Sequence, residues 1–202
     1  MIEQQFDKLL NIHTEEFQKG FNDSAHYNRY EPTPYHALET LFQHYDIQSK
    51  DHVVDFGCGK GRLNFYIHYH FNATVTGIEM NASFYNEALM NQLNYIKEGK
   101  KNKEKIHFHC CLAEEYEIAS LDNVFYFFNP FSVQVFMKVI NNILLSVEQN
   151  PRDVELILYY GSEDYLQFLE YQTAFELKEE VRIPRLYENN PYERFLIYRL
   201  EV

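Results

Sequence analysis

Glycines stand at alternate positions in the segment Val54-Asp55-Phe56-Gly57-Cys58-Gly59-Lys60-Gly61-Arg62. The short apolar run at residues 52–57 predicts a buried strand, and the pattern of residues 61–71 predicts a helix. The glycines therefore lie where a strand passes into a helix. Glycine adopts backbone conformations that other residues avoid, and its lack of a side chain lets a ligand approach the backbone closely. The segment indicates a ligand-binding turn in a fold whose strands lead into helices.

Strand-like and helix-like patterns alternate along the rest of the chain. Predicted strands cover residues 52–57, 74–80, 105–112, 123–131 and 154–161, and predicted helices cover residues 1–24, Tyr35–Tyr45, 61–71, 82–98, 132–147 and 163–171. Such alternation is typical of a parallel α/β sheet with helices on both faces. The last two strand-like runs, Phe175–Ile183 and Arg194–Leu200, have no helical pattern between them. They predict an antiparallel hairpin at a sheet edge.

Length and patterning indicate one domain. A chain of 202 residues fits a single domain, because domains average roughly 150 residues. The chain has no internal repeat and no linker-like stretch. We expect one domain over residues 1–202, with an N-terminal helical segment at 1–45 and a sheet-containing core at 51–202. In the helix at 82–98 we expect one apolar side, formed by Ala88, Leu89, Leu93 and Ile96.

Charge and cysteine content restrict the partners and the compartment. Acidic residues outnumber basic ones by 30 to 18, which gives a formal net charge of −12. A negative field repels phosphate backbones and argues against DNA as a partner. The sequence contains no apolar run of about 18 residues that predicts a membrane span, and its N-terminus lacks the pattern of a signal peptide. Three cysteines, an odd and low count, indicate a reduced, cytoplasmic protein.

Three side chains that can bind metals alternate along a predicted strand. His107, His109 and Cys111 would share one face of this strand. The cysteine spacing fits no zinc pattern. We expect these side chains to be buried in the sheet, with no metal bound.

The spacing of the glycines separates two kinds of nucleotide-binding turn. A dinucleotide-binding turn has the spacing Gly-x-Gly-x-x-Gly, which would place its third glycine at the position of Arg62. The spacing Gly-x-Gly-x-Gly after Asp55 resembles motif I of the class I S-adenosylmethionine (SAM)-dependent methyltransferases instead. Glu79 ends the second predicted strand, where that family has an acidic residue. Asn129-Pro130-Phe131 ends the fourth predicted strand, at the position of the family's motif IV. The resemblance covers residues 35–202.

This resemblance implies a Rossmann-like, doubly wound, seven-stranded sheet, mostly parallel, and SAM as the cofactor. The implied role of Glu79 is to accept hydrogen bonds from the ribose hydroxyls. Leu112 stands where the family often has an acidic residue for the adenine, so the adenine would pack against Leu112 and nearby backbone. The residues that the resemblance places at the cofactor are Asp55, Phe56, Gly57, Cys58, Gly59, Gly61, Glu79, Met80, Leu112, Ala113 and Asn129.

The segment Asn129-Pro130-Phe131 supplies the candidate catalytic residues. It resembles the Asn-Pro-Pro-Tyr/Phe motif of methyltransferases that act on planar amines, although the second proline is missing. The Asn129 amide oxygen and the Pro130 carbonyl would accept hydrogen bonds from an amino group, and Phe131 would stack against a flat acceptor. In the alternative interpretation, the Asn-Pro pair only ends the strand and starts the next helix.

Tyr30 and Tyr35 are the candidate substrate-binding residues. They lie in a tyrosine-rich segment before the sheet, and in many relatives the N-terminal segment covers the cofactor and shapes the acceptor pocket. In the alternative interpretation, both tyrosines pack the N-terminal helices onto the core.

These observations predict a SAM-dependent methyltransferase whose acceptor is a small molecule or a protein side chain. Two alternatives remain open. The first is an NAD(P)-dependent oxidoreductase, because a glycine-rich turn with a downstream acidic residue also suits those enzymes. The second is a SAM-binding regulatory protein without turnover. No pattern in the sequence predicts the oligomeric state.

Overall fold

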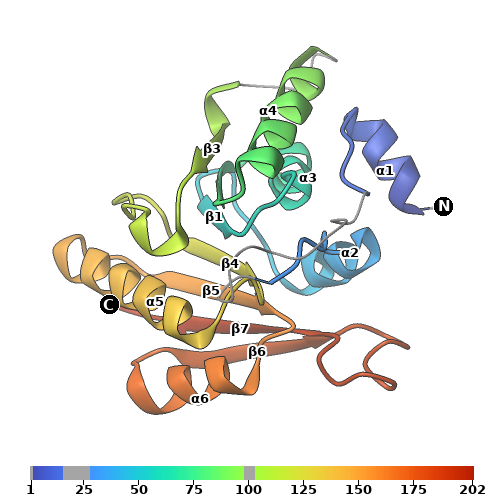
Figure 1. Ribbon diagram of the computed structural model, residues 1–202. Coiled ribbons are helices and arrows are strands. Elements are labelled where there is room, and N and C mark those ends of the chain that lie inside the picture. Colours follow the sequence, from blue (N-terminus) through green and yellow to red (C-terminus); the bar gives the residue numbers. More distant parts are fainter. Residues whose placement is uncertain (1, 16–27, 98–102) are drawn as a thin grey trace.

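The computed structural model of the chain describes residues 2–15, 28–97 and 103–202 (Figure 1). A seven-stranded sheet with the order β3-β2-β1-β4-β5-β7-β6 lies at its centre. The strands are β1 (His52–Phe56), β2 (Thr74–Glu79), β3 (Ile106–Cys110), β4 (Val124–Phe128), β5 (Val154–Tyr159), β6 (Glu176–Arg182) and β7 (Arg194–Leu200). Strands β1 to β5 pair in parallel, and β7 is antiparallel to β5 and β6. The predicted sheet and its terminal hairpin are confirmed.

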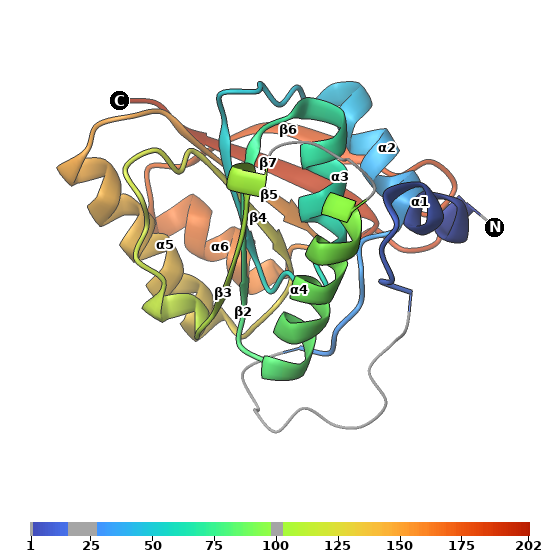
Figure 2. The same cartoon turned by 90° about the horizontal axis from the view of Figure 1, so that it is seen from above.

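Helices cover both faces of the sheet. They are α1 (Ile2–Leu10), α2 (Tyr35–His44), α3 (Arg62–Phe71), α4 (Ala82–Lys97), α5 (Val133–Gln149) and α6 (Glu163–Gln172), with short 3-10 turns η1 (Lys103–Lys105) and η2 (Ala113–Glu115). Seen from above, α5 and α6 lie on one face, and α1 to α4 lie on the other (Figure 2). Across the described ranges, every helix is too short or too polar to cross a membrane.

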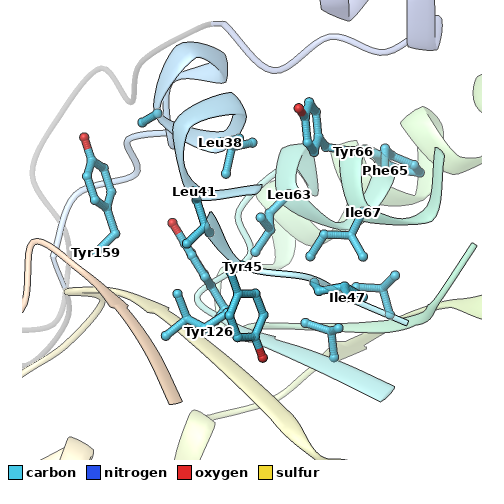
Figure 3. Close-up of a cluster of buried hydrophobic side chains, with 14 of the residues drawn as sticks. Leu38, Leu41, Tyr45, Ile47, Leu63, Phe65, Tyr66, Ile67, Tyr126 and Tyr159 are labelled. Atoms are coloured by element: carbon cyan, nitrogen blue, oxygen red, sulfur yellow. The ribbon is translucent and has the colours of Figure 1, made fainter. Parts of the chain in front are cut away.

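Each face of the sheet has its own apolar cluster, and β4 contributes to both. Phe125 and Phe127 belong to the cluster under α5 and α6, whereas Val124 and Tyr126 belong to the cluster under α2 and α3. Side chains alternate across a strand, so a strand that is covered on both faces has to be apolar throughout. Figure 3 shows the second cluster, where side chains of α2 and α3 meet those of the sheet. Burying one Leu or Phe side chain stabilises the fold by about 1.5–3 kcal/mol.

The N-terminal helix is shorter than expected. Helix α1 ends at Leu10, and residues 16–24 of the expected helix lie outside the described part of the chain. Asn11 adopts a left-handed conformation with φ of 55°. The chain then turns so that the Asp7 carboxylate accepts a hydrogen bond from the Thr14 N–H (2.6 Å). This turn directs residues 12–15 back over α1 toward the core.

Candidate active site

The glycine-rich turn lies at the carboxyl end of β1, where the chain passes into α3. Gly57, Gly59 and Gly61 have φ angles of 80°, 55° and 86°, in the left-handed region that strains residues with a side chain. A Cβ atom on Gly57 would stand 2.7 Å from the Cβ of Pro130, so a side chain would also lack space. The Gly57 N–H donates to the carbonyl of Ile78 (2.9 Å). The turn is therefore fixed against both neighbouring strands.

Glu79 is the last residue of β2 and lies beside the turn. One carboxylate oxygen accepts a hydrogen bond from the Gly59 N–H (2.9 Å), and the other accepts one from the Asn81 N–H (2.7 Å). Burial raises the pKa of Glu79, whereas these hydrogen bonds act in the opposite direction. Each oxygen retains a second lone pair, so Glu79 can accept further hydrogen bonds from hydroxyl groups. Met80 follows it and is half-buried.

Asp55 lies beneath the turn with only 4% of its surface exposed. Burial, reinforced by the charge of Glu79, raises the pKa of Asp55 to about 8. Within the described ranges, no group donates a hydrogen bond to the Asp55 carboxyl. Asp55 lines a small cavity of about 30 Å³ together with Gly57, Cys58 and Tyr30. A buried carboxyl without a donor is suited to pair with a cationic group.

The remaining predicted cofactor residues lie around this centre. Phe56 belongs to the core, where its ring stacks on Phe127 at a centroid distance of 5.1 Å. Leu112 and Ala113 follow β3, with Leu112 36% exposed and Ala113 4% exposed. Leu112 thus presents an apolar side chain at the surface beyond β3. The expected contact of these two residues with adenine stays a prediction.

The segment after β4 presents two carbonyl groups at the strand end. Asn129 has φ of 39°, and its carbonyl accepts a hydrogen bond from the side-chain amide of Asn28 (2.6 Å). The Pro130 carbonyl accepts one from the backbone N–H of Asn28 (2.9 Å). Phe131 is 2% exposed, and its ring packs edge-on against Phe127. This position disagrees with the expected stacking of Phe131 on an acceptor, because the ring belongs to the core.

Tyr30 packs directly on the glycine-rich turn. Two of its ring carbons lie 2.0 and 2.3 Å from the point where a Cβ atom of Gly59 would stand. Its hydroxyl donates to the Thr14 carbonyl (2.9 Å), and its ring centroid lies 4.9 Å from that of Phe84. The structure therefore brings Tyr30 together with the predicted cofactor residues.

Tyr35 lies in a different environment, at the start of α2, and is fully buried. Its hydroxyl donates to the Asp7 carboxylate (2.6 Å), and its ring stacks on Phe6 at 4.7 Å. The Arg62 guanidinium lies 4.5 Å from the ring centroid. These contacts match the alternative interpretation, in which Tyr35 packs the N-terminal helices onto the core.

The sequence predicts that Arg62 either meets a carboxylate or is a charge on the helix surface, and it does not predict the position of Asn28. Arg62 is 4% exposed, pairs with Glu3 of α1, and donates from Nε to the hydroxyl of Thr14 (2.7 Å). Its signal in the sequence is a charged residue at the first position of a helix that is otherwise largely apolar. Asn28 has no comparable signal, because a single amide in a loop is common.

The expectation that the histidines of β3 are buried in the sheet is wrong. His107 and His109 are exposed because they lie on the face of β3 opposite to Phe108, whose ring packs against Phe65 of α3. In the part of the chain that the structure describes, no three His, Cys, Asp or Glu side chains are arranged to hold a metal ion.

The sheet order and the glycine-rich turn together form a Rossmann-like fold of the kind found in class I methyltransferases. Residues 34–120 match the family model described as a methyltransferase domain, and the predicted resemblance to this family is confirmed. A search of curated proteins finds no match to the sequence.

Solved structures with this fold resemble the chain over most of its length. An RNA methyltransferase from Salinibacter ruber in complex with S-adenosylhomocysteine is 16% identical, with a TM-score of 0.56 and coverage of 84% of this chain and 92% of that one. A SAM-dependent methyltransferase from Thiobacillus denitrificans, in complex with the same ligand, is 12% identical, with a TM-score of 0.53 and coverage of 85% and 92%. The [4+2]-cyclase SpnF is 13% identical, with a TM-score of 0.61 and coverage of 100% and 95%. At these identities the likeness establishes the fold.

Proposed function

We propose that this protein is a SAM-dependent methyltransferase and that SAM binds over the glycine-rich turn. The observation that carries this proposal is the Asp55 carboxyl, which is buried beside Gly57 and receives no hydrogen bond within the described ranges. SAM carries an ammonium group and a sulfonium, both cationic. A contact with the ammonium would favour the ionised form of Asp55 and give this carboxyl the charged partner that it lacks.

The other residues of the site suit the rest of SAM. Glu79 has free lone pairs for the ribose hydroxyls, and Met80, Leu112 and Ala113 offer apolar contacts for the adenine. When bound, SAM supplies an electrophilic methyl group. The protein orients that group toward an acceptor, and such positioning is a large part of the catalysis of transfer reactions. We assign these roles to one domain over residues 1–202, with residues 1–45 as its N-terminal segment.

The acceptor is expected to lie at the carboxyl end of β4. The Asn129 and Pro130 carbonyls accept two N–H donors of Asn28 there, and an acceptor amino group would make the same kind of contact. A small molecule or a protein side chain fits this arrangement. DNA does not suit a chain with a net charge of −12.

Calorimetry with S-adenosylhomocysteine tests the cofactor assignment. We expect a dissociation constant in the micromolar range, about −8 kcal/mol, and an increase in melting temperature through linkage. NAD and NADP, tested in parallel, should leave the melting temperature unchanged. A shift produced only by one of those two cofactors would favour the oxidoreductase alternative.

Methyl-labelled SAM then separates an enzyme from a binding protein. Incubation with fractionated cell extract should transfer the label to one fraction, whose acceptor can be identified. Binding of S-adenosylhomocysteine without any transfer to such fractions would favour a regulatory protein.

A further inference from the structure

Residues 28–33 cover the part of the proposed cofactor site that lies beside Asp55 and the glycine-rich turn. Tyr30, Glu31, Pro32 and Thr33 line a cavity of about 30 Å³ there, together with Asp55 and Gly57. Such a cavity holds about one water molecule, whereas ligand pockets measure roughly 300–1,000 Å³. The space beside Asp55 is therefore too small for the ammonium end of SAM while these residues stay in place.

The Tyr30 ring is the part of the segment that lies deepest against the turn. Its contact with the backbone of Gly59 leaves no gap for a ligand atom between ring and glycine. The hydrogen bond from the Tyr30 hydroxyl to the Thr14 carbonyl and the ring contact with Phe84 hold the Tyr30 ring in this position. Burial raises the pKa of the Tyr30 phenol, so the group stays neutral and donates a hydrogen bond to the Thr14 carbonyl.

Asn28 holds the other end of the segment. Its planar side-chain amide and its backbone N–H donate to the carbonyls of Asn129 and Pro130. The proposed function assigns these same carbonyls to the acceptor. One short segment thus covers the cofactor side and the acceptor side of the site together.

We propose that residues 28–33 are an autoinhibitory segment, in which Tyr30 occupies the part of the cofactor position beside Gly59 and Asn28 occupies the acceptor position. This inference rests on the proposed function, because that function defines both positions. The segment and the cofactor compete for the same space. The apparent affinity for cofactor is then the intrinsic affinity multiplied by the fraction of molecules in which the segment has left.

Two single substitutions each remove one hydrogen bond that holds residues 28–33 over the site, one at each end of the segment. Tyr30→Phe keeps the ring and removes the hydroxyl bond to Thr14, and Asn28→Ala removes the side-chain bond to Asn129. We expect each variant to bind S-adenosylhomocysteine about 2- to 13-fold more tightly than the parent, which is the equivalent of one hydrogen bond. Tyr171→Phe is the matched control, since Tyr171 lies on α6 and is 75% exposed. Calorimetry should give this control the affinity of the parent.

The thiol of Cys58 reports the opening of the segment without any cofactor. Cys58 is buried in the turn and lines the same cavity as Tyr30. In a background with Cys110→Ser and Cys111→Ser, a thiol reagent should label Cys58 slowly, because labelling requires opening. When opening is rare, Tyr30→Phe and Asn28→Ala should increase the labelling rate by the same factor as the affinity. Tyr171→Phe should not change it.

The two measurements distinguish the possible failures. Weaker or unchanged S-adenosylhomocysteine binding by both variants, with an unchanged labelling rate, would overturn the inference and leave the proposed function standing. In that case Tyr30 is an ordinary cofactor contact. If none of the four proteins binds S-adenosylhomocysteine, the proposed function fails. Faster labelling of the variants would then still support closure of the turn, and equal labelling rates would overturn it.

Discussion

At the residue scale, Asp55 couples proton binding to stability. Its folded-state pKa of about 8 lies above the ordinary value of 3.8, so between these values the folded protein holds a proton that the unfolded chain has released. The free energy of unfolding should therefore fall as pH rises from about 4 to about 8. Chemical denaturation at a series of pH values measures this slope. In Asp55→Asn it should become flatter, and an identical slope in both proteins would contradict the pKa assignment.

Glu79 should act mainly on cofactor affinity. Replacing it by Ala removes the carboxylate that would accept charge-assisted hydrogen bonds from the ribose hydroxyls, a loss of about 1.5–3 kcal/mol, or roughly 10- to 150-fold in affinity for S-adenosylhomocysteine. The change also frees the Gly59 N–H, so the melting temperature has to be compared. Glu163→Ala, an exposed position on α6, is the control. Unchanged affinity with an intact fold would remove Glu79 from the site.

Asn129 should affect transfer more than binding. Asn129→Ala keeps the backbone carbonyl and removes the side-chain amide, whose oxygen we also expect to accept a hydrogen bond from the acceptor. Because this position lies beyond β4, away from the expected ribose and adenine contacts, the variant should bind SAM within a few-fold of the parent. Loss of one positioned polar group near developing charge costs roughly 2.7–4 kcal/mol, about 10² to 10³ in rate. Single-turnover rates with the identified acceptor measure this effect. Equal rates would support the alternative in which Asn129 and Pro130 only end the strand.

At the scale of elements, Asp7 fastens α1 to the core. Its carboxylate accepts hydrogen bonds from the Thr14 N–H and hydroxyl and from the Tyr35 hydroxyl. Asp7→Ala would leave these buried donors unpaired, and we expect the free energy of unfolding to fall by about 1–3 kcal/mol. Lys8→Ala changes the next residue, which is exposed, and should have little effect. Urea denaturation compares the two, and equal stabilities would mean that Asp7 does not fasten the helix.

Helix α4 shows a limit of sequence patterns, because its buried face differs from the predicted one. The apolar side expected for α4 includes Leu93, which is 50% exposed, whereas Asn91 and Tyr95 are buried. Asn91 is buried because its amide bridges the backbones of His13 and Lys60. Hydrophobic periodicity predicts the helix but treats asparagine as a surface residue. A buried polar residue whose partners are remote in the sequence gives no local signal.

Local sequence predicted the strands, but it did not predict the long-range contacts of the candidate site. The alternation of elements and the spacing of the glycines predicted the sheet, because these features depend on local sequence. The covering of the turn by Tyr30 and the pairing of Asn28 with the end of β4 depend on residues about thirty and a hundred positions apart. Their partners follow from tertiary packing, which a single sequence does not encode in any short pattern.

At the scale of the whole molecule, the net charge of −12 should control encounters with polyanions. We expect no measurable binding to a random DNA duplex at about 0.15 M salt, because non-specific affinity requires cationic groups that release counterions. Fluorescence anisotropy with a labelled duplex tests this expectation. A measurable binding constant whose logarithm falls steeply with the logarithm of the salt concentration would instead indicate a local basic surface on this acidic protein.

Strand β6 has a consequence for how the molecule behaves in a crowded solution. Among the residues that the structure describes, it pairs only with β7, and the open side of such a strand is a template on which another chain can extend the sheet. Five of its seven residues are charged in the sequence ELKEEVR, and Glu180 is held by Arg182 and Arg194. An added strand would have to strip water from these charges. The sheet therefore stops at this edge for an electrostatic reason, and the protein should resist fibril growth from it.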